Sequence, residues 1–158
     1  MSSFTLFDAV ESLFGRIRES IVANHQAGAE TADLCNLHLL ELEALFGHRL
    51  LLRAIEIIDG KQLITLYRTP DGDSALVEVP GSQLGTVYKV FPHINFCACE
   101  SFRGNVLSEN NQPTCKHVLA ARLALILGKT TEKVLSEDTL ISLKQNFAKD
   151  CFKQTSKH

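Results

Sequence analysis

Hydrophobic residues near the N-terminus recur every three or four positions, which is the periodicity of an amphipathic helix. A second helix is predicted from Thr31 to Phe46, where Gly47 suits a left-handed C-terminal cap. Its leucines cover much of the helix circumference, so we expect this helix to be buried on more than one side. These segments form a predicted helical region over residues 1–48. The apolar positions of the first helix are Phe7, Val10, Phe14, Ile17 and Ile21.

From Leu50 onward the pattern changes to short apolar runs separated by turn residues, which is typical of strands. The turn signals are Asp59-Gly60, Pro70-Asp71-Gly72 and Pro80-Gly81. We therefore predict an antiparallel β meander over residues 49–86. The segment 49–58 also fits a helical continuation, and we prefer the strand interpretation there while keeping the helix as an alternative.

The third part of the chain, residues 87–128, combines strand and helix signals. Val87 begins further β material, and a polar loop follows it. Thr114 can cap a helix that runs from Cys115 to about Leu127 and that Gly128 would stop. We predict a β hairpin plus a helix for this part.

The last part, residues 129–158, is predicted to be a C-terminal helix with a basic tail. Ser136 precedes an amphipathic pattern in which Leu140, Leu143 and Phe147 face inward. The fold class predicted for the whole chain is α+β.

Composition narrows the class of protein. The chain has 158 residues, a net charge of −2 and 45% hydrophobic residues, as in ordinary globular domains. The longest apolar run, residues 118–127, is far shorter than the ~20 residues that a membrane helix needs. Asp8 and Glu11 interrupt the stretch in which a signal peptide has its apolar core, so we expect neither export nor a membrane anchor.

Three of the five cysteines lie close together in sequence, in Cys97-Ala98-Cys99 and Cys115-Lys116-His117. Three thiols and one imidazole are the ligands that zinc binds in closed tetrahedral sites. Residues 97 and 99 of an extended backbone project to the same side, so both sulfurs can reach one ion. Residues 115 and 117 fall in the first turn of the predicted helix, where the helix dipole favours thiolate. The sequence therefore predicts a zinc site formed by Cys97, Cys99, Cys115 and His117.

The other cysteines and histidines have no such partners nearby in sequence. His93 is a weaker alternative ligand, because it stands beside Pro92 in a predicted turn. The rest are interpreted as packing or ordinary surface residues: Cys35, Cys151, His25, His38 and His48.

The spacing C-x-C followed by C-x-H resembles the SWIM zinc finger, and CACESF with TCKHVLAARLAL is similar to the whole motif. Phe102 falls where the motif commonly carries an aromatic residue, and Ala120 falls where it carries a small one. The resemblance extends over residues 87–128. It implies the same four zinc ligands: Cys97, Cys99, Cys115 and His117.

The chain as a whole resembles the Sws family, whose members are subunits of Shu-type recombination complexes. The shared features are a leading helix, Leu45-Phe46-Gly47, a strand pair around Ile64-Thr65-Leu66 and a single C-terminal SWIM motif. This resemblance implies a nuclear, non-enzymatic subunit that pairs with a RecA-type recombinase paralogue. Together they would promote assembly of the recombinase filament on single-stranded DNA. It implies no membrane and no small-molecule substrate.

The sequence also permits two other functions. A stand-alone nucleic-acid-binding SWIM zinc finger is the alternative, although no dense basic stripe is visible. An enzyme is disfavoured, since four protein ligands leave zinc no open position and no Gly-x-x-x-x-Gly-Lys-Ser/Thr loop is present. Asp71 and Asp73 are better interpreted as turn residues than as a catalytic pair. The cations that could contact phosphates are Lys89, Arg103, Lys116, Arg122 and Lys129.

Overall fold

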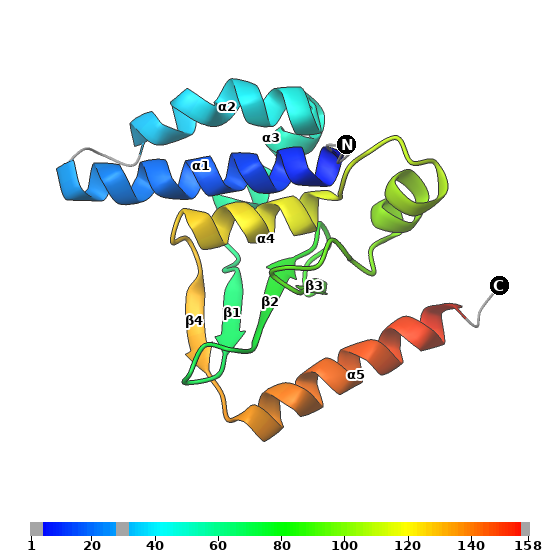
Figure 1. Cartoon of the computed structure of the whole chain (residues 1–158). Coiled ribbons are helices and arrows are strands. Elements are labelled where there is room, and N and C mark those ends of the chain that lie inside the picture. The colour runs from blue at the N-terminus through cyan, green and yellow to red at the C-terminus, as the bar shows by residue number, and fades with distance from the viewer. Residues whose placement is uncertain (1–4, 28–31, 156–158) are drawn as a thin grey trace.

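The computed structural model describes residues 5–27 and 32–155 (Figure 1). Its first two elements are the helices α1 (Leu6–Ala27) and α2 (Ala32–Phe46). The predicted apolar face of α1 is buried at every described position, from Val10 to Ile21. On α2 only one side is covered, because Leu42 and Phe46 are buried while Leu40 is 77% exposed. The expectation that α2 is buried on several sides is therefore wrong for the side chains that the structure describes.

Residues His48–Ile58 form a helix, α3, so the strand interpretation of 49–58 is wrong and the helical alternative is confirmed. The buried residues Leu50, Leu51 and Ala54 recur at helical spacing on one face. Gly47 joins α2 to α3 with a φ of 78°, a backbone conformation that would be strained in a residue with a side chain. The predicted turn at residues 59–60 is instead the end of α3, since the Asp59 amide donates to the Ile55 carbonyl at 2.9 Å.

The sheet has four strands in the order β3-β2-β1-β4. The predicted meander over residues 49–86 is confirmed for β1 (Thr65–Arg68) and β2 (Ala75–Pro80), which are antiparallel neighbours. The strand β3 (Val87–Val90) is antiparallel to β2, so the hairpin predicted for residues 87–128 forms between β3 and this strand of the meander. The turn predicted at residues 70–72 joins β1 to β2, with Gly72 at a φ of 80°. An additional strand, β4 (Thr131–Val134), pairs in parallel with β1, so the sheet is mixed.

The β4 strand corrects the prediction for residues 129–158, in which no strand was expected. All four of its side chains are exposed, so its composition carries no apolar pattern. The pairing is instead made by the backbone and by an ion pair of 2.9 Å between Arg68 and Glu132. The predicted terminal helix follows as α5 (Glu137–Thr155), with Leu140 and Phe147 buried.

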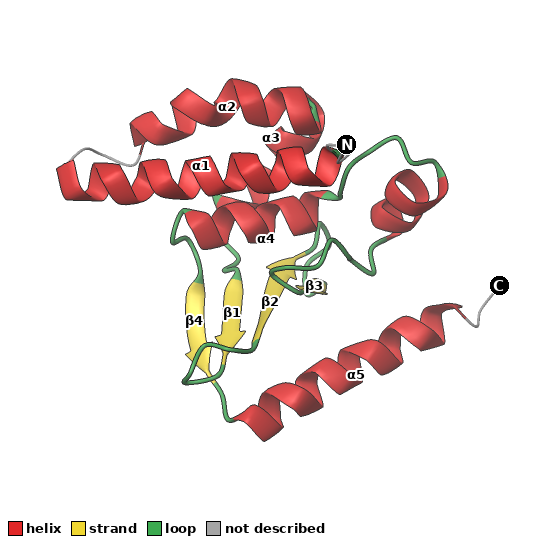
Figure 2. Cartoon of the chain, in the orientation of Figure 1, coloured by secondary structure: helices red, strands yellow, loops and turns green. Residues whose placement is uncertain are grey.

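The core lies between the sheet and a central helix, α4 (Lys116–Ile126). Helices α1 and α3 pack on the side of α4 that faces away from the sheet, and α5 packs against β2. Figure 2 shows α1 to α4 gathered at one end of the strands and α5 apart from them. Seven of the eleven residues of α4 are buried, so these internal contacts explain most of its long apolar run.

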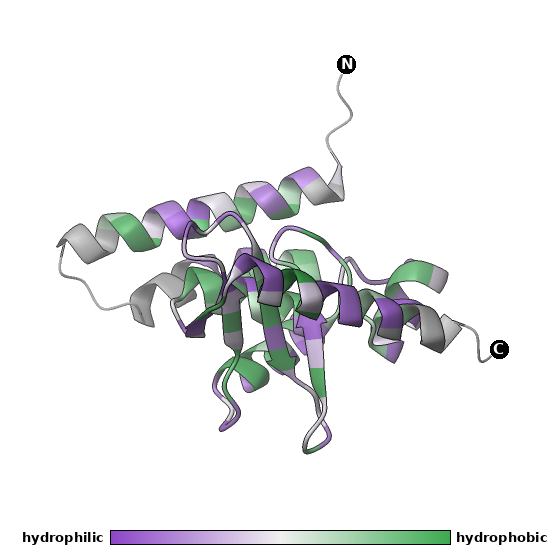
Figure 3. Ribbon diagram, turned by 90° about the horizontal axis from the view of Figure 1, so that it is seen from below, coloured by the Kyte–Doolittle hydropathy of each residue, from purple (hydrophilic) through white to green (hydrophobic). Residues whose placement is uncertain are grey.

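The hydropathy of the helices follows this arrangement. Green hydrophobic and purple hydrophilic positions alternate along α1 in Figure 3, as expected for a helix with one covered side. None of the helices in the described part of the chain has the length and apolar character needed to cross a bilayer.

Candidate metal centre

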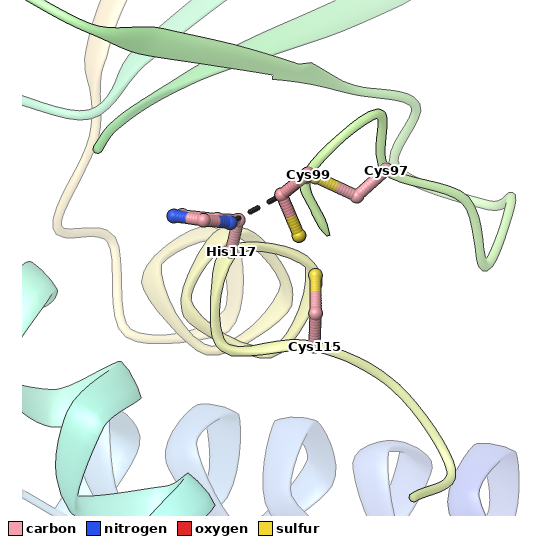
Figure 4. Close-up of side chains that lie close together, drawn as sticks. All are labelled: Cys97, Cys99, Cys115 and His117. Atoms are coloured by element: carbon pink, nitrogen blue, oxygen red, sulfur yellow. Dashed lines mark hydrogen bonds between the residues drawn. The ribbon is translucent and has the colours of Figure 1, made fainter. Parts of the chain in front are cut away.

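Two segments of the chain, around residues 97–99 and 115–117, bring the four predicted ligands together (Figure 4). Cys97 and Cys99 lie in the irregular segment between β3 and a short π-helical turn, η1 (Phe102–Ser108). Cys115 is the residue that caps the N-terminus of α4, and His117 lies in the first turn of that helix. Figure 4 shows their side chains converging on one point. We call these residues the Cys3His cluster.

The geometry of the Cys3His cluster fits a tetrahedral metal ion. The four ligand atoms all lie within 4.8 Å of one another, and all four residues are at most 3% exposed. The Cys97 Sγ lies 3.8 Å from the His117 Nδ1. Four-coordinate zinc with Zn–S bonds of ~2.3 Å would hold its sulfur ligands ~3.8 Å apart, so little movement is needed to bind it.

The pKa values of the cysteine thiols are shifted in opposite directions, because the thiols are buried side by side and hydrogen-bond to one another. Hydrogen bonds from Cys115 and Cys97 hold the pKa of Cys99 well below its ordinary value, and the Phe102 amide also donates to its sulfur at 3.3 Å. Hydrogen bonding with Cys115 and Cys99, together with burial, raises the pKa of Cys97. A bound cation would remove this competition by stabilising thiolates at all three positions.

Tyr88 of β3 stacks on the imidazole of His117, with ring centroids 4.1 Å apart and planes inclined by 28°. This contact holds the ring so that Nδ1 faces the thiols. Nε2 is buried and has no hydrogen-bond partner among the described residues. Burial and the nearby cysteines raise the pKa of Tyr88. Tyr88 was not among the predicted site residues, because its sequence context indicates only a strand position.

Asn95 connects the two halves of the Cys3His cluster. Its side chain accepts a hydrogen bond from the Thr114 hydroxyl at 2.7 Å and donates to the Pro113 carbonyl at 2.9 Å. Thr114 therefore does not cap α4 as predicted, because its hydroxyl is used across the cluster and Cys115 takes the capping position. Asn95 was not among the predicted site residues, since nothing in its local sequence indicates this contact.

Phe102, the first residue of η1, belongs to the same buried core as the ligands and is 1% exposed. Its ring lies 5.7 Å from that of Phe96, in an edge-on arrangement. The aromatic position noted in the sequence is thus a packing position beside the ligands. The predicted polar loop at residues 100–114 contains η1, which was not anticipated.

The other histidines and cysteines lie outside the cluster where the structure describes them. His93 is exposed, and His38 is buried with its ring nitrogens near Glu41 at 2.8 Å and Ser20 at 3.1 Å. His48 pairs with Glu43, and Cys151 is half-buried. The side chains of Cys35 and His25 are outside the described residues, as are those of Leu34 and Leu37.

Two of the five candidate phosphate-binding cations are already paired within the fold. Arg122 lies 2.6 Å from Glu11 and also stacks over the ring of Phe14, 4.2 Å from its centroid. Lys129 lies 2.7 Å from Asp59. These two residues therefore stabilise the helical region and are poor candidates for contacts with a ligand.

Sequence similarity to known proteins agrees with the geometry. Over 114 residues, the chain is 31% identical to human zinc finger SWIM domain-containing protein 7, covering 72% of this chain and 79% of the human protein. The chain belongs to the zinc finger SWIM domain-containing protein 7 family. The mouse member is 30% identical over 66% of each chain, and the zebrafish member is 29% identical over 65% of this chain and 70% of its own.

No family model matches the chain, and no solved structure matches it either. Membership in the zinc finger SWIM domain-containing protein 7 family therefore rests on the three vertebrate relatives. The name of that family refers to a SWIM zinc finger, and the Cys3His cluster is the group of described residues that could hold its metal ion.

Proposed function

We propose that this protein is a non-enzymatic, zinc-binding subunit of a Shu-type complex that acts in the nucleus. In this proposal it pairs with a RecA-type recombinase paralogue and promotes assembly of the recombinase filament on single-stranded DNA during homologous recombination repair. The observation that carries the proposal is membership in the zinc finger SWIM domain-containing protein 7 family. The resemblance of that family to Sws subunits supplies the partner and the process.

The composition of the Cys3His cluster supports zinc in a structural role. Thiolate and imidazole ligands favour zinc over magnesium or calcium, which prefer oxygen. Four protein ligands would complete the tetrahedral shell and leave no position for a reactive water. All four residues are buried, so the ion would stabilise the junction of β3, η1 and α4.

Exposed apolar side chains support a protein partner. The long apolar run of α4 is mostly buried inside the fold, so it does not supply such a surface. Large apolar residues nevertheless remain on the outside: Leu84 is 94% exposed, Leu40 is 77% exposed and Leu63 is 70% exposed. A paralogue that covered some of these side chains would gain the free energy of removing them from water.

Co-expression with candidate RecA-type paralogues tests the proposal. We expect higher soluble yield with the correct paralogue, a heterodimer by light scattering, and single-stranded DNA binding mainly by that complex. A fluorescent fusion should accumulate in the nucleus. A stable monomer that pairs with no paralogue and binds DNA tightly would instead support the stand-alone nucleic-acid-binding zinc finger.

A further inference from the structure

Two adjoining hollows on the surface share Arg53 and Lys116 as part of their walls. The first hollow, of about 290 Å³, also has the guanidinium of Arg49 in its lining. No Asp or Glu is among the residues that line it. The cations come from α3 and from the first residue of α4, which are adjacent because these two helices pack closely together.

Neutral hydrogen-bonding groups complete the lining of the first hollow. They are the side chains of Ser101, Asn105 and Gln112, from the segment that contains η1. Asn105 already donates to the Ser101 hydroxyl at 3.2 Å, so these two side chains hold each other in place. Hydroxyl and amide groups beside cations are the combination that binds phosphate oxygens.

The cations of this hollow lack internal counter-charges. Among the side chains that the structure describes, those of Arg49 and Arg53 make no ion pair or hydrogen bond, and that of Lys116 donates a hydrogen bond only to the hydroxyl of Ser82. Arg49 and Arg53 are four residues apart on α3, where like charges repel across one helical turn. An anion between them would relieve this repulsion.

Four other basic residues of the fold, Arg16, Arg68, Arg122 and Lys129, each have a carboxylate partner. Exposed cations without such a partner also occur singly, as at Arg18 and Lys149. The surface formed by α3 and the start of α4 instead gathers three cations in one hollow that no carboxylate lines.

We propose that this surface binds successive backbone phosphates of single-stranded DNA, with Arg49, Arg53 and Lys116 as the central contacts. The second hollow continues the surface with Lys61 and Gln62, which favours a polyanion over a ligand with one phosphate. Guanidinium groups can bind phosphate through two parallel hydrogen bonds. The choice of single-stranded DNA rests on the proposed function.

One carboxylate limits the second hollow, because Glu56 also lines it. The first hollow is therefore the stronger phosphate site. The Cys3His cluster positions this site as well, since Lys116 stands between Cys115 and His117. Every variant must accordingly be tested with its metal bound.

The test uses the zinc-loaded full chain, alone and in complex with its paralogue, and measures fluorescence anisotropy of labelled oligo(dT) across a salt series. The double variant Arg49→Gln/Arg53→Gln should lower affinity about tenfold and reduce the slope of log affinity against log salt by about 1.4, since each contact with single-stranded DNA contributes about 0.7. Lys61→Gln, in the second hollow, should reduce the slope by about 0.7.

The matched control is Arg18→Gln/Lys149→Gln, which removes the same charge from exposed positions on α1 and α5. It should bind oligo(dT) within about twofold of the unmodified protein, because these cations lie outside the site. Zinc content and thermal unfolding establish that each variant is folded. If the double variant does not fold, Arg53→Gln and Lys61→Gln are measured separately for the same loss of slope.

Several results would overturn the inference. They are unchanged affinity in the Arg49/Arg53 variant, a loss of affinity with an unchanged salt slope, equal binding of duplex DNA, and tighter binding of a phosphoserine peptide that displaces oligo(dT). Failure to pair with any paralogue would overturn the proposed function instead. In that case the effect of the variants on oligo(dT) binding by the chain alone still tests the site.

Discussion

The Cys3His cluster and the helical region of α1, α2 and α3 lie on different sides of α4 and are held together by different interactions. In the cluster, four polar side chains lie within 4.8 Å of one another, and we expect one metal ion to hold them together. In the helical region, apolar residues such as Leu13 and Leu51, both at most 3% exposed, share the burial among many contacts. We therefore expect damage to be all-or-none in the cluster and graded in the helices.

The largest effect should follow from losing a metal ligand. Cys115→Ser or His117→Ala should release zinc and unfold residues 87–128, because structural zinc sites contribute ~10–16 kcal/mol of apparent binding free energy in peptides. That value is comparable to the total stability of many domains, ~5–15 kcal/mol. Elemental analysis and circular dichroism of the purified variants measure both losses.

Cys35→Ser and Cys151→Ser are the matched thiol controls, and both should retain zinc. A Cys151 variant that loses the metal while His117→Ala keeps it would show that the ligand assignment is wrong. So would a metal-free protein that remains fully folded.

A substitution in the helical region should have a smaller effect and leave the metal bound. Leu13→Ala should lower the free energy of unfolding by ~2–5 kcal/mol, since it removes buried methyl groups and leaves a cavity. Urea denaturation measures the loss, and elemental analysis should still give one zinc per chain. Leu40→Ala, on the exposed side of α2, should change stability by at most ~0.5 kcal/mol. Loss of zinc from folded Leu13→Ala would contradict the separation of the two regions.

Asn95→Ala tests the connection between the two halves of the cluster. It leaves the hydroxyl of Thr114, a residue only 5% exposed, without its acceptor, so we expect a loss of ~1–3 kcal/mol. Zinc affinity should fall by about tenfold, since supporting hydrogen bonds orient metal ligands. Competition with a chromogenic chelator measures the affinity. Asn111→Ala removes only an exposed contact with Glu109 and should leave both quantities unchanged.

The smallest expected effect is a pH dependence of stability in the helical region. The hydrogen bond with His38 and the charge of Arg16 hold the pKa of Glu41 below its ordinary value of 4.5. Glu41 therefore stabilises the fold fully above about pH 4.5, and this contribution is lost as the pH falls through the lower folded pKa. Glu41→Gln should flatten this part of the stability curve in urea titrations at successive pH values. An identical acid dependence in both proteins would exclude the contribution.

The two regions also differ in how far the sequence predicts them. The Cys3His cluster was predictable because ligand type and short spacing are local properties, and four residues specify the chemistry. The contacts that support the cluster could not be predicted in the same way. Asn95 and Tyr88 belong to no sequence motif, and they acquire their roles only when distant segments of the chain meet.

In the remainder of the fold, errors arose where a local pattern permits two structures. Residues 49–58 contain apolar positions that fit a strand, but Leu50, Leu51 and Ala54 lie on one face only in a helix. The exposed cations at positions 49 and 53 repeat with the same helical spacing and could have indicated this. The β4 strand gave no signal, because its exposed side chains follow no apolar pattern and its pairing depends on β1.

The parallel pairing of β4 with β1 has a consequence for synthesis. Arg68 and Glu132, which pair across these strands, are 64 residues apart in the chain. At translation rates of about 5–20 residues per second, the outer edge of β1 therefore waits roughly 3–13 s for its neighbour to emerge. All four residues of the Cys3His cluster are synthesised within that interval. We therefore expect metal capture to order the nascent chain while the edge of β1 can still pair with wrong strands, so that zinc supply would help to determine folding yield.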